Sequence, residues 1–84
     1  MNVSNRNIVE RIARVLAGQH YSANADGNQR SASEEVDAEW PHFIDDAVAV
    51  LKTMREPDEQ MAAVGDVAVW ERMIRAALPA GELV

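Results

Sequence analysis

The residues around Asp26 are of the types that bind calcium between two helices. Asn24, Asp26 and Gly27 match the middle of a calcium-binding loop of the EF-hand kind when Gly27 takes its glycine position. In that register Ser22 and Ser33 occupy the first and last positions, where the site requires Asp and a bidentate Glu. Asn, Asp and Gly also tolerate the left-handed dihedral angles of turns. We therefore interpret this run as a turn and keep calcium binding as an alternative.

Two histidines are the other candidate metal ligands. His42 and Asp46 are four residues apart and would share one face of a helix, with Asp45 beside them. His20 would have to converge on them from the end of an earlier helix. The sequence has no cysteine and no HExxH motif. A solvated ion pair between His42 and neighbouring acids is the simpler interpretation, so we assign no metal ligand and no cofactor.

The remaining polar residues do not form a recognisable catalytic motif. The serines lie near the N-terminus or in a polar stretch, and none lies in a nucleophile elbow. Paired carboxylates need a cleft that shifts their pKa values before they can act in acid–base catalysis. Three such pairs are present: Glu34 and Glu35, Asp45 and Asp46, and Asp58 and Glu59. They fall on predicted outer faces or helix starts, so we predict that the protein is not an enzyme.

The elements that would position these residues are all predicted to be helical. Apolar residues recur at helical spacing along most of the chain, and no alternation typical of strands is present. Four helices are predicted: residues 5–17, 38–56, 57–64 and 67–78. Residues 22–36 contain few apolar side chains and are expected to form a long polar loop after the first helix. We predict an all-α fold, a small bundle of three to four helices in a single domain over residues 1–84.

Four residues predict where these helices begin and end. Gly18 and Gly65 are placed where the first and third helices would stop. Pro41 suits the first turn of the second helix, because an N–H group is dispensable there. Asp66 is a suitable N-cap for the last helix.

The charge of the chain is uneven. Fourteen acidic residues against eight Lys and Arg give a net charge of −6 in 84 residues. The first 33 residues carry four Arg against two acids, whereas residues 34–66 carry ten acids against two bases. Ordinary solvated faces are the simplest interpretation, although the two regions could attract each other within or between chains. The acidic balance argues against a general nucleic-acid binder.

Large apolar residues on the predicted helices are candidate interface or structural anchors. Six residues form this set: Trp40, Phe43, Met54, Met61, Trp70 and Met73. Trp is enriched at the energetic centres of protein interfaces. A core of this size rarely supplies more than about 3–5 kcal/mol, so completion of the core by a second chain, as a homo-oligomer, is expected.

The segment from Trp40 to Leu78 resembles a group of small uncharacterised bacterial and prophage-type helical proteins. The resemblance rests on Met-Arg-Glu-Pro-Asp-Glu-Gln-Met at 54–61 and on Trp-Glu-Arg-Met-Ile-Arg-Ala-Ala-Leu at 70–78. It implies a small intracellular helical protein and no catalytic residues. A phage-type assembly is then a candidate partner.

A non-enzymatic protein–protein interaction or accessory module is the function that these observations favour. The alternative is a DNA-associated regulator, with a degenerate helix-turn-helix in the last two helices and Arg72 and Arg75 near phosphate. A divalent-metal-binding protein is the third hypothesis. We expect a cytoplasmic location, because cysteine is absent, no apolar run is long enough for a membrane span and the N-terminal residues are polar.

Overall fold

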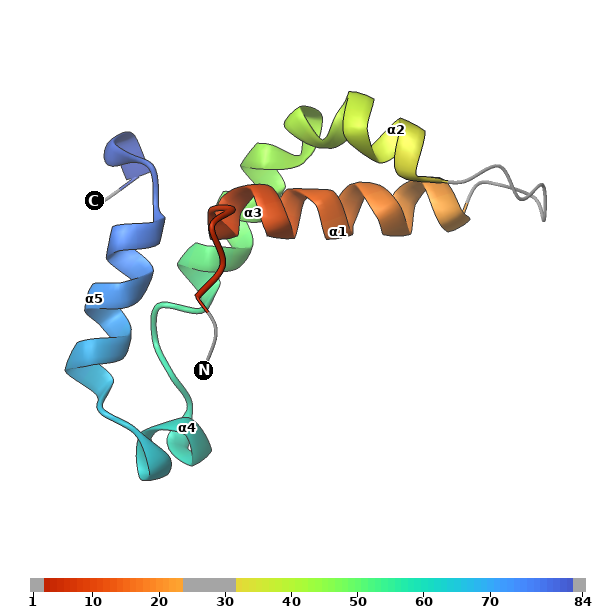
Figure 1. Cartoon of the computed structure of the whole chain (residues 1–84). Coiled ribbons are helices and arrows are strands. Elements are labelled where there is room, and N and C mark those ends of the chain that lie inside the picture. The colour runs from red at the N-terminus through yellow and green to blue at the C-terminus, as the bar shows by residue number, and fades with distance from the viewer. Residues whose placement is uncertain (1–2, 24–31, 83–84) are drawn as a thin grey trace. The chain divides into compact units, whose positions relative to one another are not determined.

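All regular elements of the described residues are helical. The structure, a computed structural model, describes residues 3–23 and 32–82 (Figure 1). The elements in chain order are α1 (Ile8–Ala23), α2 (Ala32–Glu39), the 3₁₀-helix η1 (Trp40–Phe43), α3 (Ile44–Thr53), α4 (Glu59–Val64), α5 (Val67–Ala77) and the 3₁₀-helix η2 (Ala80–Glu82). Within the described ranges there is no strand, and the all-α prediction is confirmed.

The first helix is longer than the sequence predicts. We expected it to end at residue 17, but α1 continues through Gly18 to Ala23. A Cβ built on Gly18 would lie 3.8 Å from Cγ2 of Val36, so α2 packs closely at this position. Glycine costs helix stability because of its backbone entropy. This tertiary contact offsets that cost, and Gly18 is a packing residue instead of a helix stop.

The expected loop at 22–36 is partly helical. Ser22 and Ala23 belong to α1, and residues 32–36 belong to α2, while residues 24–31 lie outside the described residues. Glu34 and Glu35 lie in the first turn of α2, where acidic side chains complement the helix dipole. The sequence does not predict a helix here, because Val36 is the only large apolar residue between 22 and 36 and no apolar periodicity results.

The single helix expected at 38–56 is three elements. Residues 38 and 39 end α2, η1 follows with Pro41 in its first turn as expected, and α3 then ends at Thr53. The Thr53 hydroxyl donates a hydrogen bond of 3.0 Å to the carbonyl of Ala49 within this last turn. Pro41 has no backbone N–H group to donate, which favours the break in the α-helical hydrogen-bonding pattern between α2 and α3.

Two aspartates define the starts of the last helices. The Asp58 carboxylate accepts from the Met61 amide at 2.9 Å, and the Asp66 carboxylate accepts from the Val69 amide at 3.1 Å. Both are N-caps of the usual kind, which confirms the expectation for Asp66. Gly65 follows α4 as expected, but its φ of −147° and ψ of −169° are extended and not left-handed.

The chain divides into two compact units, and the single domain over residues 1–84 stays a prediction. The N-terminal unit is Met1–Ala47 and the C-terminal unit is Val48–Val84, with the boundary inside α3. In the N-terminal unit α1 contacts α2 and η1, and α1 and α2 lie side by side (Figure 1). Its buried residues are the alanines Ala13, Ala17 and Ala47. Those of the C-terminal unit are Val48, Leu51, Ile74 and Leu78.

Candidate functional site

The six candidate anchors are divided between the two units. Trp40 and Phe43 belong to η1 in the N-terminal unit, and both are half-buried. The ring of Phe43 lies 5.7 Å from that of His20 and 6.5 Å from that of Tyr21, measured between centroids. These aromatic contacts join the end of α1 to η1. Phe43 therefore has a packing role within its own unit.

Trp40 is held by Arg14, which also links α1 to α2. The guanidinium carbon of Arg14 lies 5.4 Å from the centroid of the Trp40 ring. Arg14 donates to Asp37 at 2.7 Å and to Glu10 at 2.8 Å. The hydrogen bonds to Asp37 and then Glu10 raise the pKa of Arg14 above its ordinary value, so this side chain stays charged. Trp40 thus has a structural role too.

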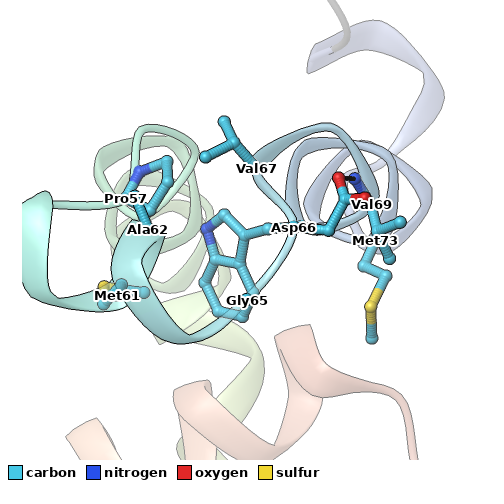
Figure 2. A pocket seen from close by; sticks show the side chains of 9 residues that line it. Pro57, Met61, Ala62, Gly65, Asp66, Val67, Val69 and Met73 are labelled. Carbon is cyan, nitrogen blue, oxygen red and sulfur yellow. Dashed lines mark hydrogen bonds between the residues drawn. The ribbon is translucent and has the colours of Figure 1, made fainter.

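The other anchors lie in the C-terminal unit, and three of them surround one apolar hollow. Met61 comes from α4, and Trp70 and Met73 come from α5 (Figure 2). The complete lining is Pro57, Met61, Ala62, Gly65, Asp66, Val67, Val69, Trp70 and Met73. We call this feature the α4–α5 hollow. Met54 does not line it.

Hydrogen bonds between side chains and the backbone hold the hollow at its edges. The caps at Asp58 and Asp66 fix the starts of α4 and α5 on either side of the turn at Gly65. The indole N–H of Trp70 donates to the carbonyl of Met54 at 2.7 Å. This bond satisfies a carbonyl at the end of α3 that the helix itself leaves free. Trp70 is thereby fixed with its ring in the lining.

The hollow is small, apolar and open. Its volume is about 230 Å³, below the roughly 300–1,000 Å³ of pockets that enclose a drug-sized ligand. Asp66 is its single ionisable lining residue, and that carboxylate already accepts the Val69 amide. Met61 is 40% exposed and Met73 60% exposed. The arrangement can accept one or two apolar side chains from outside and offers little for bond-making chemistry.

The candidate metal ligands that the structure describes are not assembled into a site. His42 Nδ1 lies 3.2 Å from Glu39 Oε2, so its ionic neighbour is the acid three residues before it and not Asp46. Across residues 3–23 and 32–82 no group of three or more His, Asp or Glu could hold a metal ion. Asn24 and Asp26 lie outside the described residues.

Sequence reasoning missed part of the lining. Pro57, Ala62, Gly65 and Val69 line the hollow but are not among the candidate site residues of the sequence analysis. A usable signal was present, because residues 61–70 read Met-Ala-Ala-Val-Gly-Asp-Val-Ala-Val-Trp. Eight of these ten residues are apolar, too many for the buried faces of two short helices. The structure exposes several of them, including Val64 at 89%.

None of the helices in the described ranges is long and apolar enough to cross a membrane. The comparisons with known proteins do not add a functional assignment. The chain matches no family model, no curated protein and no solved structure.

Proposed function

We propose that this protein is a non-enzymatic interaction or accessory module that binds another protein through the α4–α5 hollow. The observation that carries the proposal is the exposure of large apolar side chains around that hollow. Met61, Val67, Val69 and Met73 all line it and are all exposed. A partner that covers these side chains would remove apolar surface from water. This burial contributes about 25 cal/mol of favourable free energy per Å².

The composition of the lining also supports protein binding. Methionine is flexible and polarizable, and it is common on surfaces that adapt to different partners. Trp70 adds a rigid ring fixed by its hydrogen bond to Met54. Tryptophan dominates the binding energy of many interfaces. A fixed aromatic residue between two adaptable methionines is a suitable receptor for an apolar anchor.

A DNA-associated function has less support. A helix-turn-helix in α4 and α5 would present α5 to the major groove, with Arg72 and Arg75 near phosphate. Arg75 lies 3.9 Å from Glu71, however. From residue 56 to residue 71 the chain carries five acids and no Lys or Arg. Such a surface repels a phosphate backbone. A metal-binding function is the third alternative, and no particular observation favours it.

The proposal includes the setting in which the module acts. We propose that the protein, which has no cysteine, is cytoplasmic and forms a homo-oligomer. We also propose that its partner belongs to a phage-type assembly. The resemblance of residues 54–61 and 70–78 to prophage-type proteins supports the last of these. Light scattering at several protein concentrations tests the homo-oligomer, and a mass that stays monomeric throughout would remove it.

A random peptide display library tests binding at the hollow. The peptides selected on the wild-type chain should bind the double variant Met61→Gln/Met73→Gln at least about tenfold more weakly, a loss of about 1.4 kcal/mol. Gln keeps the length and the helix propensity of Met but is polar. Met54→Gln is the matched control, because Met54 is exposed but outside the lining. Peptides that bind the double variant as well as the wild type, or no selected peptide at all, would contradict the proposal.

A further inference from the structure

The acids near the α4–α5 hollow form a continuous stretch without a base. Glu56, Asp58, Glu59, Asp66 and Glu71 lie between Arg55 and Arg72, and no Lys or Arg occurs among residues 56–71. All five acids are exposed. The lining residues from Pro57 to Trp70 fall within the same stretch. The chain segment that builds most of the apolar hollow therefore carries only negative charge, and Asp66 of this run lies in the lining itself.

Most of this charge has no cation beside it. Glu71 is 3.9 Å from Arg75, but Glu56, Asp58, Glu59 and Asp66 form no ion pair with any cation of the described residues. Asp58 and Asp66 accept backbone amides, which leaves their negative charge in place. Exposed charges contribute little to stability by themselves. They do attract an oppositely charged partner and exclude a negatively charged one.

We infer that the partner of the hollow is a basic amphipathic helix of another protein, an inference that rests on the function proposed above. One apolar side chain of that helix enters the hollow between Met61 and Met73. Lys or Arg residues on either side of it face Glu56, Glu59 and the neighbouring acids. Apolar and basic residues at helical spacing combine in this way in helix-in-groove recognition. The described residues include no strand, so no sheet edge is available for strand addition.

A second copy of the chain suits the hollow less well. Two hollows placed face to face would bring like charges together, which is unfavourable at an interface. The basic helix of the chain, α1, already uses its apolar face against α2 and η1. Val15 is its single large apolar residue with high exposure, at 61%. The charges therefore favour a partner of different sequence.

Two designed peptides test the inference on the full chain by calorimetry and fluorescence anisotropy. One is an Ala/Lys helix of about 16 residues, long enough to populate helix, with two leucines at i and i+4. The other replaces each Lys with Glu. We expect the Lys peptide to bind at least about tenfold more tightly than the Glu peptide at low salt. Its affinity should fall as salt is added, because exposed charges are screened.

Charge reversal locates the effect. The double variant Glu56→Lys/Glu59→Lys should bind the Lys peptide at least about tenfold more weakly than the wild type. Asp45→Lys/Asp46→Lys is the matched control, since these two adjacent acids are also exposed but belong to the N-terminal unit. The control should change the affinity by no more than about twofold. Replacement of both leucines by alanine should abolish binding, because the hollow then receives no anchor.

The outcomes separate this inference from the proposed function. Equal binding of both peptides, with loss in Met61→Gln/Met73→Gln, would overturn the basic partner and leave the interaction site standing. If the two charge-reversal pairs weakened binding of the Lys peptide equally, the inference would also be overturned. The peptide would then respond to the net charge of the chain and not to the acids near the hollow. Absence of binding by either peptide up to about 1 mM would overturn it as well. Failure of the display experiment instead counts against the hollow itself.

Discussion

The two units of this chain use their side chains in opposite ways. In the N-terminal unit small alanines are buried, and the larger residues are held by partners: Arg14 by Glu10 and Asp37, and Phe43 by His20 and Tyr21. In the C-terminal unit a few aliphatic side chains are buried, but many other aliphatic and thioether side chains are exposed. Its exposed large apolar residues are Val50, Met54, Met61, Val64, Val67, Val69 and Met73. The comparable residues of the N-terminal unit are Val3 and Val15.

This difference is the basis of the binding role that we propose for the C-terminal unit. In the N-terminal unit Ala13 and Ala17 of α1 are fully buried, and Val36 of α2 lies close to Gly18. Exposure of apolar surface is unfavourable unless a partner removes it from water. The C-terminal unit retains such surface around the α4–α5 hollow. The comparison can be tested by substitutions that should matter in one unit and not in the other.

The largest effect is expected at Ala13. Ala13→Asp places a carboxylate at a position with 0% exposure, and a buried charge without a partner costs about 3–5 kcal/mol. A domain of this size has little more than that in total stability. We expect the helical circular dichroism signal to decrease as α1 and α2 unfold, and the cooperative thermal transition to disappear.

The matched substitution is Val15→Asp, two residues further along the same helix. Val15 is 61% exposed, so its replacement should change the free energy of unfolding by no more than about 0.5 kcal/mol. If both variants unfold equally, the N-terminal unit does not have the alanine core that the structure assigns to it.

A large but smaller effect is expected from Leu51 in α3. Leu51 is 1% exposed, and truncation of a buried leucine to alanine costs about 2–5 kcal/mol. Urea denaturation should show a lower midpoint for Leu51→Ala. Met73→Gln should leave the free energy of unfolding within about 0.5 kcal/mol of that of the wild type, because Met73 is exposed. A strong loss of stability in Met73→Gln would mean that the hollow is part of the core and not a binding surface.

The smallest effect is expected at the ion pair between α1 and α2. Asp37→Asn removes one carboxylate from Arg14 and should lower the melting temperature by a few degrees at low salt, with the difference disappearing at about 1 M salt. Asp45→Asn is the control, because Asp45 forms no ion pair with a cation of the described residues. A salt-independent loss in Asp37→Asn would assign the role of this residue to packing instead of charge.

Much of the secondary structure follows from local signals in the sequence. Asp66 was recognised as an N-cap because its carboxylate can accept the amide of Val69 from a position fixed by the chain itself. Pro41 was placed in a first turn for an equally local reason. Local signals do not give the end of α1, because Gly18 favours a helix stop whereas in the structure it packs inside the helix near Val36. That contact joins residues 18 positions apart, beyond the reach of periodicity.

The candidate site shows the same division. Met61, Trp70 and Met73 were selected from the sequence as large apolar residues on helical stripes, whereas Pro57, Gly65 and Val69 joined them only through the fold. Trp40 and Phe43 were selected by the same criterion and proved to belong to a different cluster. Hydrophobicity identifies a residue that needs a neighbour but does not identify the neighbour.

By itself the sequence determined the helical class, the N-cap of the last helix and the run of acids from 56 to 71. Each of these depends on residues within a turn or two of one another, or on composition alone. Only the tertiary structure decided that the chain forms two units and that Arg14 links two helices. It also decided that α4 and α5 leave an apolar hollow with Asp66, one of those acids, in its lining. The physical reason is that side-chain burial is a property of distant segments brought together, whereas helix formation is largely a property of neighbours along the chain.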